Sequence, residues 1–269
     1  MSIKGPVRLA AVMCGPLLIG AFAATNAAAT PATTSTPSSL AAAVAPLAAS
    51  PVHQSLFGLC NPLFTPQPTD SFPGTVVKAD NFESGLSGYT LNTAGTGSVA
   101  ISSSQAHTGS CSVHIHATTD STSLANMSVN LPSGNEVYTD GWFNITAAGV
   151  AGNDVPYFRF FAGSTRVMDV YRYNDNGQLW LRVLSPDGTF AYTRLTLTAI
   201  PLNAWHHVQT HVIANGSSST VEVWFDGTQL LSTNQVNTSA TSLSSVMLGS
   251  EHLKQMEDNY VDDLIVKAH

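Results

Sequence analysis

Thr220-Val221-Glu222-Val223-Trp224-Phe225, followed by Asp226-Gly227, is the stretch that decides the fold class. Polar and apolar side chains alternate through Thr220–Val223, which is the period of a β-strand with one buried face. Asp226-Gly227 supplies residue types that tolerate the positive φ of a tight hairpin turn. The stretch therefore predicts an antiparallel strand that turns back on itself.

The same period recurs through the rest of the chain from Val76 onward, with turn signals such as Asp175-Asn176-Gly177 between the segments. No stretch shows a sustained helical period. Because two packed sheets are the natural way to bury the apolar faces of such strands, we predict an all-β fold, a two-sheet antiparallel β-sandwich in residues 76–269. The other alternating segments are Val99–Ile101, Ser112–His116, Met127–Leu131, Phe158–Phe160 and Leu179–Val183.

Three pieces of the chain, taken in order, resemble the C-terminal half of laminin-G-like, concanavalin A-type jelly rolls. They are Trp205-His206-His207-Val208, Val221–Gly227 and Asn259-Tyr260-Val261-Asp262-Asp263-Leu264-Ile265-Val266. The resemblance covers roughly Val76 to Lys267. It implies a jelly roll whose first and last strands pair, and whose broad sheet face binds glycans and in some members cuts them. It gives His206 and His207 a place on a strand, without a catalytic role.

The N-terminal residues have the composition of an export signal followed by a linker. Lys4 and Arg8 precede an apolar run, and Ala27-Ala28-Ala29 supplies small residues for cleavage, so residues 1–29 read as a signal peptide. Residues 30–50 are rich in Ala, Ser, Thr and Pro and predict a disordered stalk. Residues 51–75 carry several apolar side chains and predict an irregular segment packed on the domain. The sequence thus predicts a secreted protein with no membrane span after signal removal.

Two cysteines remain after the signal is removed, Cys60 and Cys111. In an exported chain such a pair predicts a disulfide, which would fasten the irregular segment to the sandwich. Two separate thiols are the alternative.

The formal net charge is −7, and loss of Lys4 and Arg8 with the signal takes it to −9. A chain this acidic has no broad electrostatic attraction to nucleic acid. All five remaining arginines nevertheless fall between Arg159 and Arg194, which singles out one group of strands.

Alternation within those strands places a set of aromatic and arginine side chains on one outward face. Flat rings provide platforms for sugars, and guanidinium groups donate paired hydrogen bonds to carboxylates, sulfates or hydroxyls. Cation–π packing and cross-strand ion pairs are the structural alternative. The candidate ligand-binding residues are Tyr157, Arg159, Tyr171, Trp180, Arg182, Tyr192 and Arg194, with Asp169 on the same face.

Oxygen-bearing side chains open and close the predicted domain. Asp80, Asn81 and Glu83 lie where the domain opens, in and just after its predicted first strand near Val77–Phe82, and Asp262 lies in its last strand. If these strands pair, the oxygens converge, and we therefore predict one structural calcium ion there. The alternative is that these groups end strands or cap turns. The pairs His114/His116 and His207/His211 each share a strand face but lack a third ligand, so zinc is not predicted.

Catalytic signatures are sparse in the sequence. It contains no Gly-x-Ser-x-Gly elbow and no Glu-x-Asp-x-x-Glu strand of the jelly-roll glucanases, and it lacks the alginate lyase motifs. The sequence predicts a non-catalytic module for an acidic or hydroxyl-rich extracellular or cell-wall polysaccharide. A jelly-roll lyase acting on a uronic-acid polymer is the second reading, and a structural or adhesive surface protein is the third.

Overall fold

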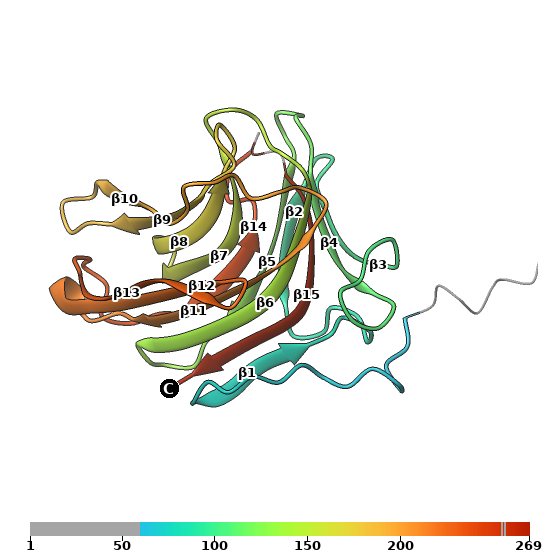
Figure 1. Cartoon of the computed structure of the whole chain (residues 1–269), viewed down its shortest axis with the longest axis horizontal. Helices are drawn as coiled ribbons and strands as arrows, with labels where there is room; N and C mark the ends of the chain where they lie inside the picture. The colour runs from blue at the N-terminus through green and yellow to red at the C-terminus, as the bar shows by residue number, and fades with distance from the viewer. Residues whose placement is uncertain (1–59, 254, 256) are drawn as a thin grey trace, which may run out of the picture. The chain divides into compact units, whose positions relative to one another are not determined.

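The computed structural model describes residues 60–253, 255 and 257–269. The predicted signal peptide and stalk lie outside the described residues. The described part forms fifteen strands and a short 3-10 helix, Gly216–Ser218. Two antiparallel sheets pack face to face, as predicted (Figure 1).

One sheet has eight strands, and its main path runs β13-β12-β11-β6-β15-β4-β3, with β1 paired to β15. Long strands occupy its middle, which leaves a broad outer face. Its members are β1 (Thr75–Asp80), β3 (Ser98–Ser102), β4 (Ser112–Ala117), β6 (Glu136–Ala147), β11 (Trp205–Ile213), β12 (Ser219–Phe225), β13 (Thr228–Val236) and β15 (Glu257–Ala268).

The second sheet has seven strands in the order β10-β9-β8-β7-β14-β5-β2. It contains the arginine-bearing strands that the sequence singled out. Its members are β2 (Thr90–Ala94), β5 (Leu124–Asn130), β7 (Asp154–Ala162), β8 (Thr165–Tyr173), β9 (Leu179–Leu184), β10 (Phe190–Arg194) and β14 (Ser245–Gly249).

The core lies between the two sheets and is made by one face of each alternating strand. On β9, Leu179, Leu181 and Val183 are buried and belong to the core cluster, whereas the residues between them are half-buried. Phe143 of β6 meets Phe158 of β7 across the core, edge to face, with ring centroids 5.1 Å apart. The alternation of apolar and polar residues along the strands thus gives a dry interior between the sheets and two outer faces that can hold polar side chains.

The first and last strands pair, as the sequence predicted. β1 runs antiparallel to β15, with Thr75 opposite Ala268 and Asp80 opposite Leu264. Within the described residues, no helix is long and apolar enough to cross a membrane.

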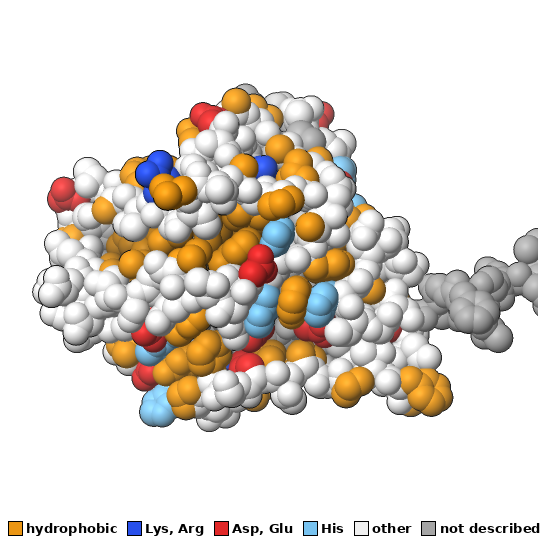
Figure 2. All heavy atoms as spheres, in the orientation of Figure 1, with side chains coloured by type: hydrophobic (Ala, Val, Ile, Leu, Met, Phe, Trp, Pro, Cys, Tyr) orange, Lys and Arg blue, Asp and Glu red, His pale blue; other side chains and the backbone are white. Residues whose placement is uncertain are grey.

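The two outer faces differ in charge. Figure 2 shows histidine and acidic side chains interspersed across the lower part of the molecule, over the eight-stranded sheet, and Lys or Arg side chains in the upper part, near β9 and β10. Strand β11 of that sheet carries His206, His207 and His211.

The predicted disulfide is present. Cys60 is bonded to Cys111, with Cα atoms 5.3 Å apart. The segment that follows Cys60 lies on the outer face of the eight-stranded sheet, where Phe72 stacks on Tyr138 with ring centroids 5.1 Å apart. Lys267 of β15 donates to the carbonyl oxygen of Phe72 at 2.6 Å. The disulfide therefore fixes one end of a segment that the sheet holds at the other.

We expect replacement of both cysteines, Cys60→Ser with Cys111→Ser, to destabilise the protein and to loosen residues 60–72. The bond joins positions 51 residues apart, and loop-closure entropy for that length predicts a loss of about 4 kcal/mol. Calorimetry should show a lower Tm, and limited proteolysis should cut the segment first. Reduced wild-type protein should behave in the same way. A variant that matches untreated wild type in both assays would contradict this prediction.

Candidate functional site

Five of the seven predicted binding residues come together on the outer face of the seven-stranded sheet. Trp180 lies directly opposite Tyr171 of β8 on one side and Arg194 of β10 on the other. Arg182 lies opposite Tyr192 of β10. Residues that face one another across antiparallel strands share a sheet face, so the register confirms this part of the alternation.

Arg159 and Tyr157 differ from the prediction. Arg159 is on the expected face, opposite Asp169, but its side chain is fully buried and not exposed. Tyr157 is on the other face. The register of β7 shifts between Pro156 and Phe158, and this bulge turns the Tyr157 ring into the core, 5.1 Å from the ring of Phe143. The placement of Tyr157 was wrong because one extra residue in a strand reverses the alternation beside it.

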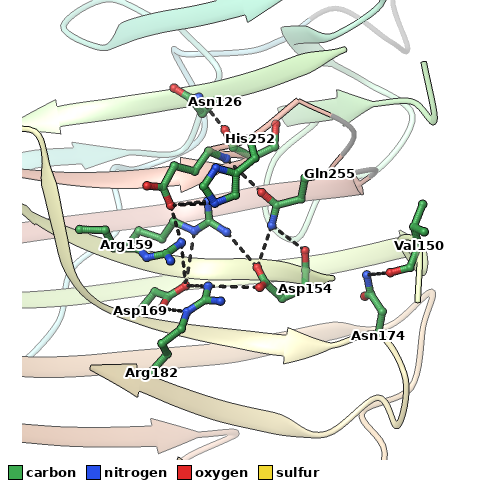
Figure 3. A network of polar contacts seen from close by, with 12 residues as sticks. Asn126, Val150, Asp154, Arg159, Asp169, Asn174, Arg182, His252 and Gln255 are labelled. Carbon is green, nitrogen blue, oxygen red and sulfur yellow. Dashed lines mark hydrogen bonds and ion pairs between the residues drawn. The ribbon is translucent and has the colours of Figure 1, made fainter. Parts of the chain in front are cut away.

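Buried ion pairs underlie the face. Arg182 Nε donates to Asp169 Oδ1 at 2.8 Å, and Arg182 Nη2 lies 3.1 Å from Asp154 Oδ2. Arg159 Nη2 donates to Asp154 Oδ1 at 2.8 Å, and Arg166 pairs with Glu251. In Figure 3, the side chains of Asp154, Arg159, Asp169 and Arg182 converge from β7, β8 and β9, and Gln255 reaches them from the loop before β15.

The charges in this network cancel. Arg159, Arg166 and Arg182 face three carboxylates, those of Asp154, Asp169 and Glu251. Although burial disfavours its charged form, hydrogen bonding to Asp169 and the charges of Asp169 and Asp154 raise the pKa of Arg182.

Arg194 is the exception on this face. In the described part of the chain, no carboxylate lies within ion-pairing distance of it. The face is therefore much less cationic than its arginine content suggests.

A pocket of about 430 Å³ opens beside the network. The Arg182 guanidinium lies 4.6 Å from the centre of the Tyr171 ring, which fixes both groups. Tyr192 is 57% exposed and forms the accessible wall. The lining residues are Gly152, Asp154, Tyr171, Tyr173, Trp180, Arg182 and Tyr192.

Sequence reasoning missed three of these residues, Gly152, Asp154 and Tyr173. A signal existed for Tyr173, because it lies two residues beyond Tyr171 and alternation gives both the same face. Its hydroxyl donates to Asp175 at 2.9 Å. Asp154 begins β7, and its neighbours Arg182 and Gln255 are distant in sequence, so alternation carried no signal for it.

Two of the predicted calcium ligands hold one loop, residues 107–111. Glu83 Oε1 accepts the N–H of Cys111 at 2.9 Å, and Asp262 Oδ2 accepts the N–H of His107 at 2.8 Å. Burial, together with the neighbouring charge of Asp263, raises the pKa of Asp262 to about 7. These carboxylates cap the loop from opposite ends.

The other two predicted ligands have separate partners. Asp80 lies 3.0 Å from Lys78 Nζ, and Asn81 donates to the carbonyl oxygen of Thr65 at 2.9 Å. Among the described residues, no group of three converging His, Cys, Asp or Glu ligand atoms includes Asp80 or Asp262. As arranged, the four residues do not form a calcium cage. Calcium binding by these residues stays a prediction.

A second hollow, of about 570 Å³, lies on the outer face of the eight-stranded sheet, between that face and residues 64–69. His207 Nε2 lies 2.7 Å from Asp140 Oδ1 at its floor. The Trp142 ring is stacked between His107 at 3.7 Å and His207 at 4.7 Å. Both faces of this ring are therefore covered, and the hollow is acidic, since Asp140 and Asp263 line it.

Comparison with known proteins identifies the fold. No family model matches the chain, and no curated protein matches it. An endo-β-1,4-glucuronan lyase from the fungus Trichoderma reesei is similar in structure at 15% identity and a TM-score of 0.54, over 68% of this chain and 92% of that one. The cellulose induced protein Cip1 is similar at 17% identity and a TM-score of 0.56, over 71% and 96%.

We expect Asp169→Ala to cost about 3–5 kcal/mol of stability, because it takes a shared counter-charge from Arg159, Arg166 and Arg182. The side chain of Asp169 is fully buried. Chemical denaturation of wild type and variant measures the difference. Asp187→Ala, in an exposed turn, is the matched control and should cost much less. Equal losses for the two variants would show that the network contributes no special stability.

Proposed function

We propose that this chain is a secreted, non-catalytic carbohydrate-binding protein that holds an uncharged, hydroxyl-rich polysaccharide in the pocket lined by Tyr171, Trp180 and Tyr192. The observation that carries the proposal is the pocket itself, where aromatic rings stand beside Arg182 and Asp154. Rings stack on the apolar faces of sugars, while the guanidinium donates to hydroxyl groups and the carboxylate accepts from them. Its volume of about 430 Å³ suits a short stretch of a glycan chain.

The charge balance favours an uncharged ligand over an acidic one. Arg159, Arg166 and Arg182 already have carboxylate partners. A uronate would compete with Asp169 and Asp154 for Arg182, and displacing a buried pair is expensive. Among the described residues of this outer face, Arg194, on the edge strand β10, is the arginine without a carboxylate partner.

The structural neighbours and the N-terminal sequence support an extracellular carbohydrate role. By their names, one neighbour is a glucuronan lyase and the other is induced by cellulose. The structural similarity supports the fold alone. The argument for carbohydrate binding rests on the pocket. The predicted signal peptide and the Cys60–Cys111 disulfide fit an oxidising, extracytoplasmic compartment.

A lyase acting on a uronic-acid polymer is the second candidate, since Tyr171 and Arg182 stand together as a base and a carboxylate-binding group would. Burial raises the pKa of Tyr171, which disfavours the phenolate that would abstract a proton. Arg182 is committed to Asp169. Binding without cleavage therefore fits this pocket better.

We expect Tyr192→Ala to weaken retention of a neutral polysaccharide roughly tenfold, because one stacked ring contributes about 1–1.5 kcal/mol. Affinity electrophoresis through gels containing β-glucan, xylan or mannan measures this. Leu91→Ala is the matched control, because Leu91 is 45% exposed on β2, the opposite edge strand of the same sheet. Its retention should equal that of wild type.

The competing functions give different results in the same experiment. Incubation with uronic-acid polymers, followed by absorbance near 235 nm, detects the unsaturated product of a lyase. Such product would overturn the non-catalytic assignment. Absence of retention on every neutral polymer, or retention that Tyr192→Ala leaves unchanged, would remove the pocket from consideration.

A further inference from the structure

His114, His116 and Asp258 converge on the outer face of the eight-stranded sheet, away from the glycan pocket. The two histidines are two residues apart on β4, so both rings project from the same face. β15 pairs with β4, and its register places Asp258 directly opposite His116 and Tyr260 opposite His114. This pairing supplies the third ligand that the sequence did not reveal.

The three ligand atoms are close enough to share an ion. His114 Nε2, His116 Nδ1 and Asp258 Oδ1 all lie within 4.8 Å of one another. The contact between His116 Nδ1 and Asp258 Oδ1 is 3.1 Å. Ligands at 2.0–2.1 Å around a tetrahedral zinc ion stand about 3.3 Å apart, so little movement is needed.

Neighbouring side chains hold the ligands in place. Thr146 Oγ1 donates to Asp258 Oδ2 at 2.6 Å, which turns Oδ1 toward both imidazoles. The Tyr260 ring stacks on the His114 ring, with centroids 4.2 Å apart and planes 4° apart. Partners of this kind orient metal ligands and fix the imidazole rings.

The site is also open on its solvent side. The side chains of His114 and His116 are 25% and 36% exposed, and that of Asp258 is 24% exposed. Two imidazole nitrogens and one carboxylate oxygen suit zinc and similar transition metals, whereas calcium prefers six to eight oxygens.

We propose that His114, His116 and Asp258 bind one divalent transition-metal ion of the zinc type, with water completing its coordination. The inference does not depend on the glycan pocket, which lies on the other sheet. The second converging group among the described residues, Cys60–Glu83–Cys111, is not a rival because its cysteines form the disulfide.

His211 shows what distinguishes the proposed site from an ordinary ion pair. Its Nδ1 lies 2.8 Å from Glu222, and its Nε2 lies 2.9 Å from Glu136. The two carboxylates occupy opposite edges of the ring, so their oxygens do not converge on one point. His211→Ala is therefore a matched control on the same sheet face.

The test uses the full mature chain without a polyhistidine tag, stripped of metal with a chelator and titrated with Co²⁺. We expect one Co²⁺ per chain, with visible d–d absorption typical of a four- or five-coordinate ion. Zn²⁺ should displace Co²⁺, and millimolar Ca²⁺ should leave the spectrum unchanged. His116→Ala and Asp258→Asn should weaken binding at least 100-fold, and Thr146→Val about 10- to 100-fold. His211→Ala should bind like wild type.

Circular dichroism accompanies each variant, and His116→Gln replaces His116→Ala if the latter does not fold. The proposal is overturned if the stripped protein gives no Co²⁺ spectrum. It is equally overturned if the His116 and Asp258 variants retain wild-type affinity, or if His211→Ala loses as much affinity as they do.

Discussion

The pairing of β15 along both of its edges is the constraint on which the rest of the molecule depends. β15 pairs with β6 along one edge, and along the other it pairs first with β4 and then with β1. A strand held on both sides cannot slip by one residue without exchanging its core and outer side chains. The change of partner occurs at Asp262–Asp263, where the register shifts and Asp263 adopts a positive φ of 48°. The carboxylates at this irregularity hold the loop of residues 107–111, and Asp258 faces the two histidines of β4.

In the seven-stranded sheet, buried ion pairs fix the positions of the side chains. Asp154 faces two arginines and Asp169 faces three, so neither of these carboxylates is left alone in a region of low dielectric. The attraction within these ion pairs is largely offset by the cost of desolvating the charged groups, so the net stabilisation is small. The ion pairs nevertheless hold their side chains in fixed positions. Arg182 is held at once by Asp169, Asp154 and the Tyr171 ring, which makes it a rigid donor at the pocket wall. A ligand that meets a rigid donor loses less conformational entropy than one that must order a free arginine.

The sequence predicted what depends on regular alternation and on first-to-last strand pairing. Trp180, Arg182, Tyr192 and Arg194 share a face because β9 and β10 pair without interruption. The same logic failed at Tyr157, because a bulge at Pro156–Phe158 sends this ring into the core. Pro156 was the available signal, since a proline cannot donate to the strand ladder and is typical of bulges. It also missed Asp154 and Asp258. Asp258 meets His114 and His116 of the distant strand β4, and Asp154 meets Arg182 of β9 as well as Arg159 of its own strand. Alternation tells which face a residue occupies, whereas the neighbour across the strand is decided by topology.

The two outer faces are chemically separate because a dry core, about 10 Å thick in a β-sandwich, lies between them. On the seven-stranded sheet, arginines are paired with carboxylates beneath the pocket. On the eight-stranded sheet, imidazoles meet carboxylates at His114, His207 and His211. The fold therefore places a charge-compensated aromatic surface on one side and a surface of paired histidines and carboxylates on the other, and a change on one face need not disturb the other.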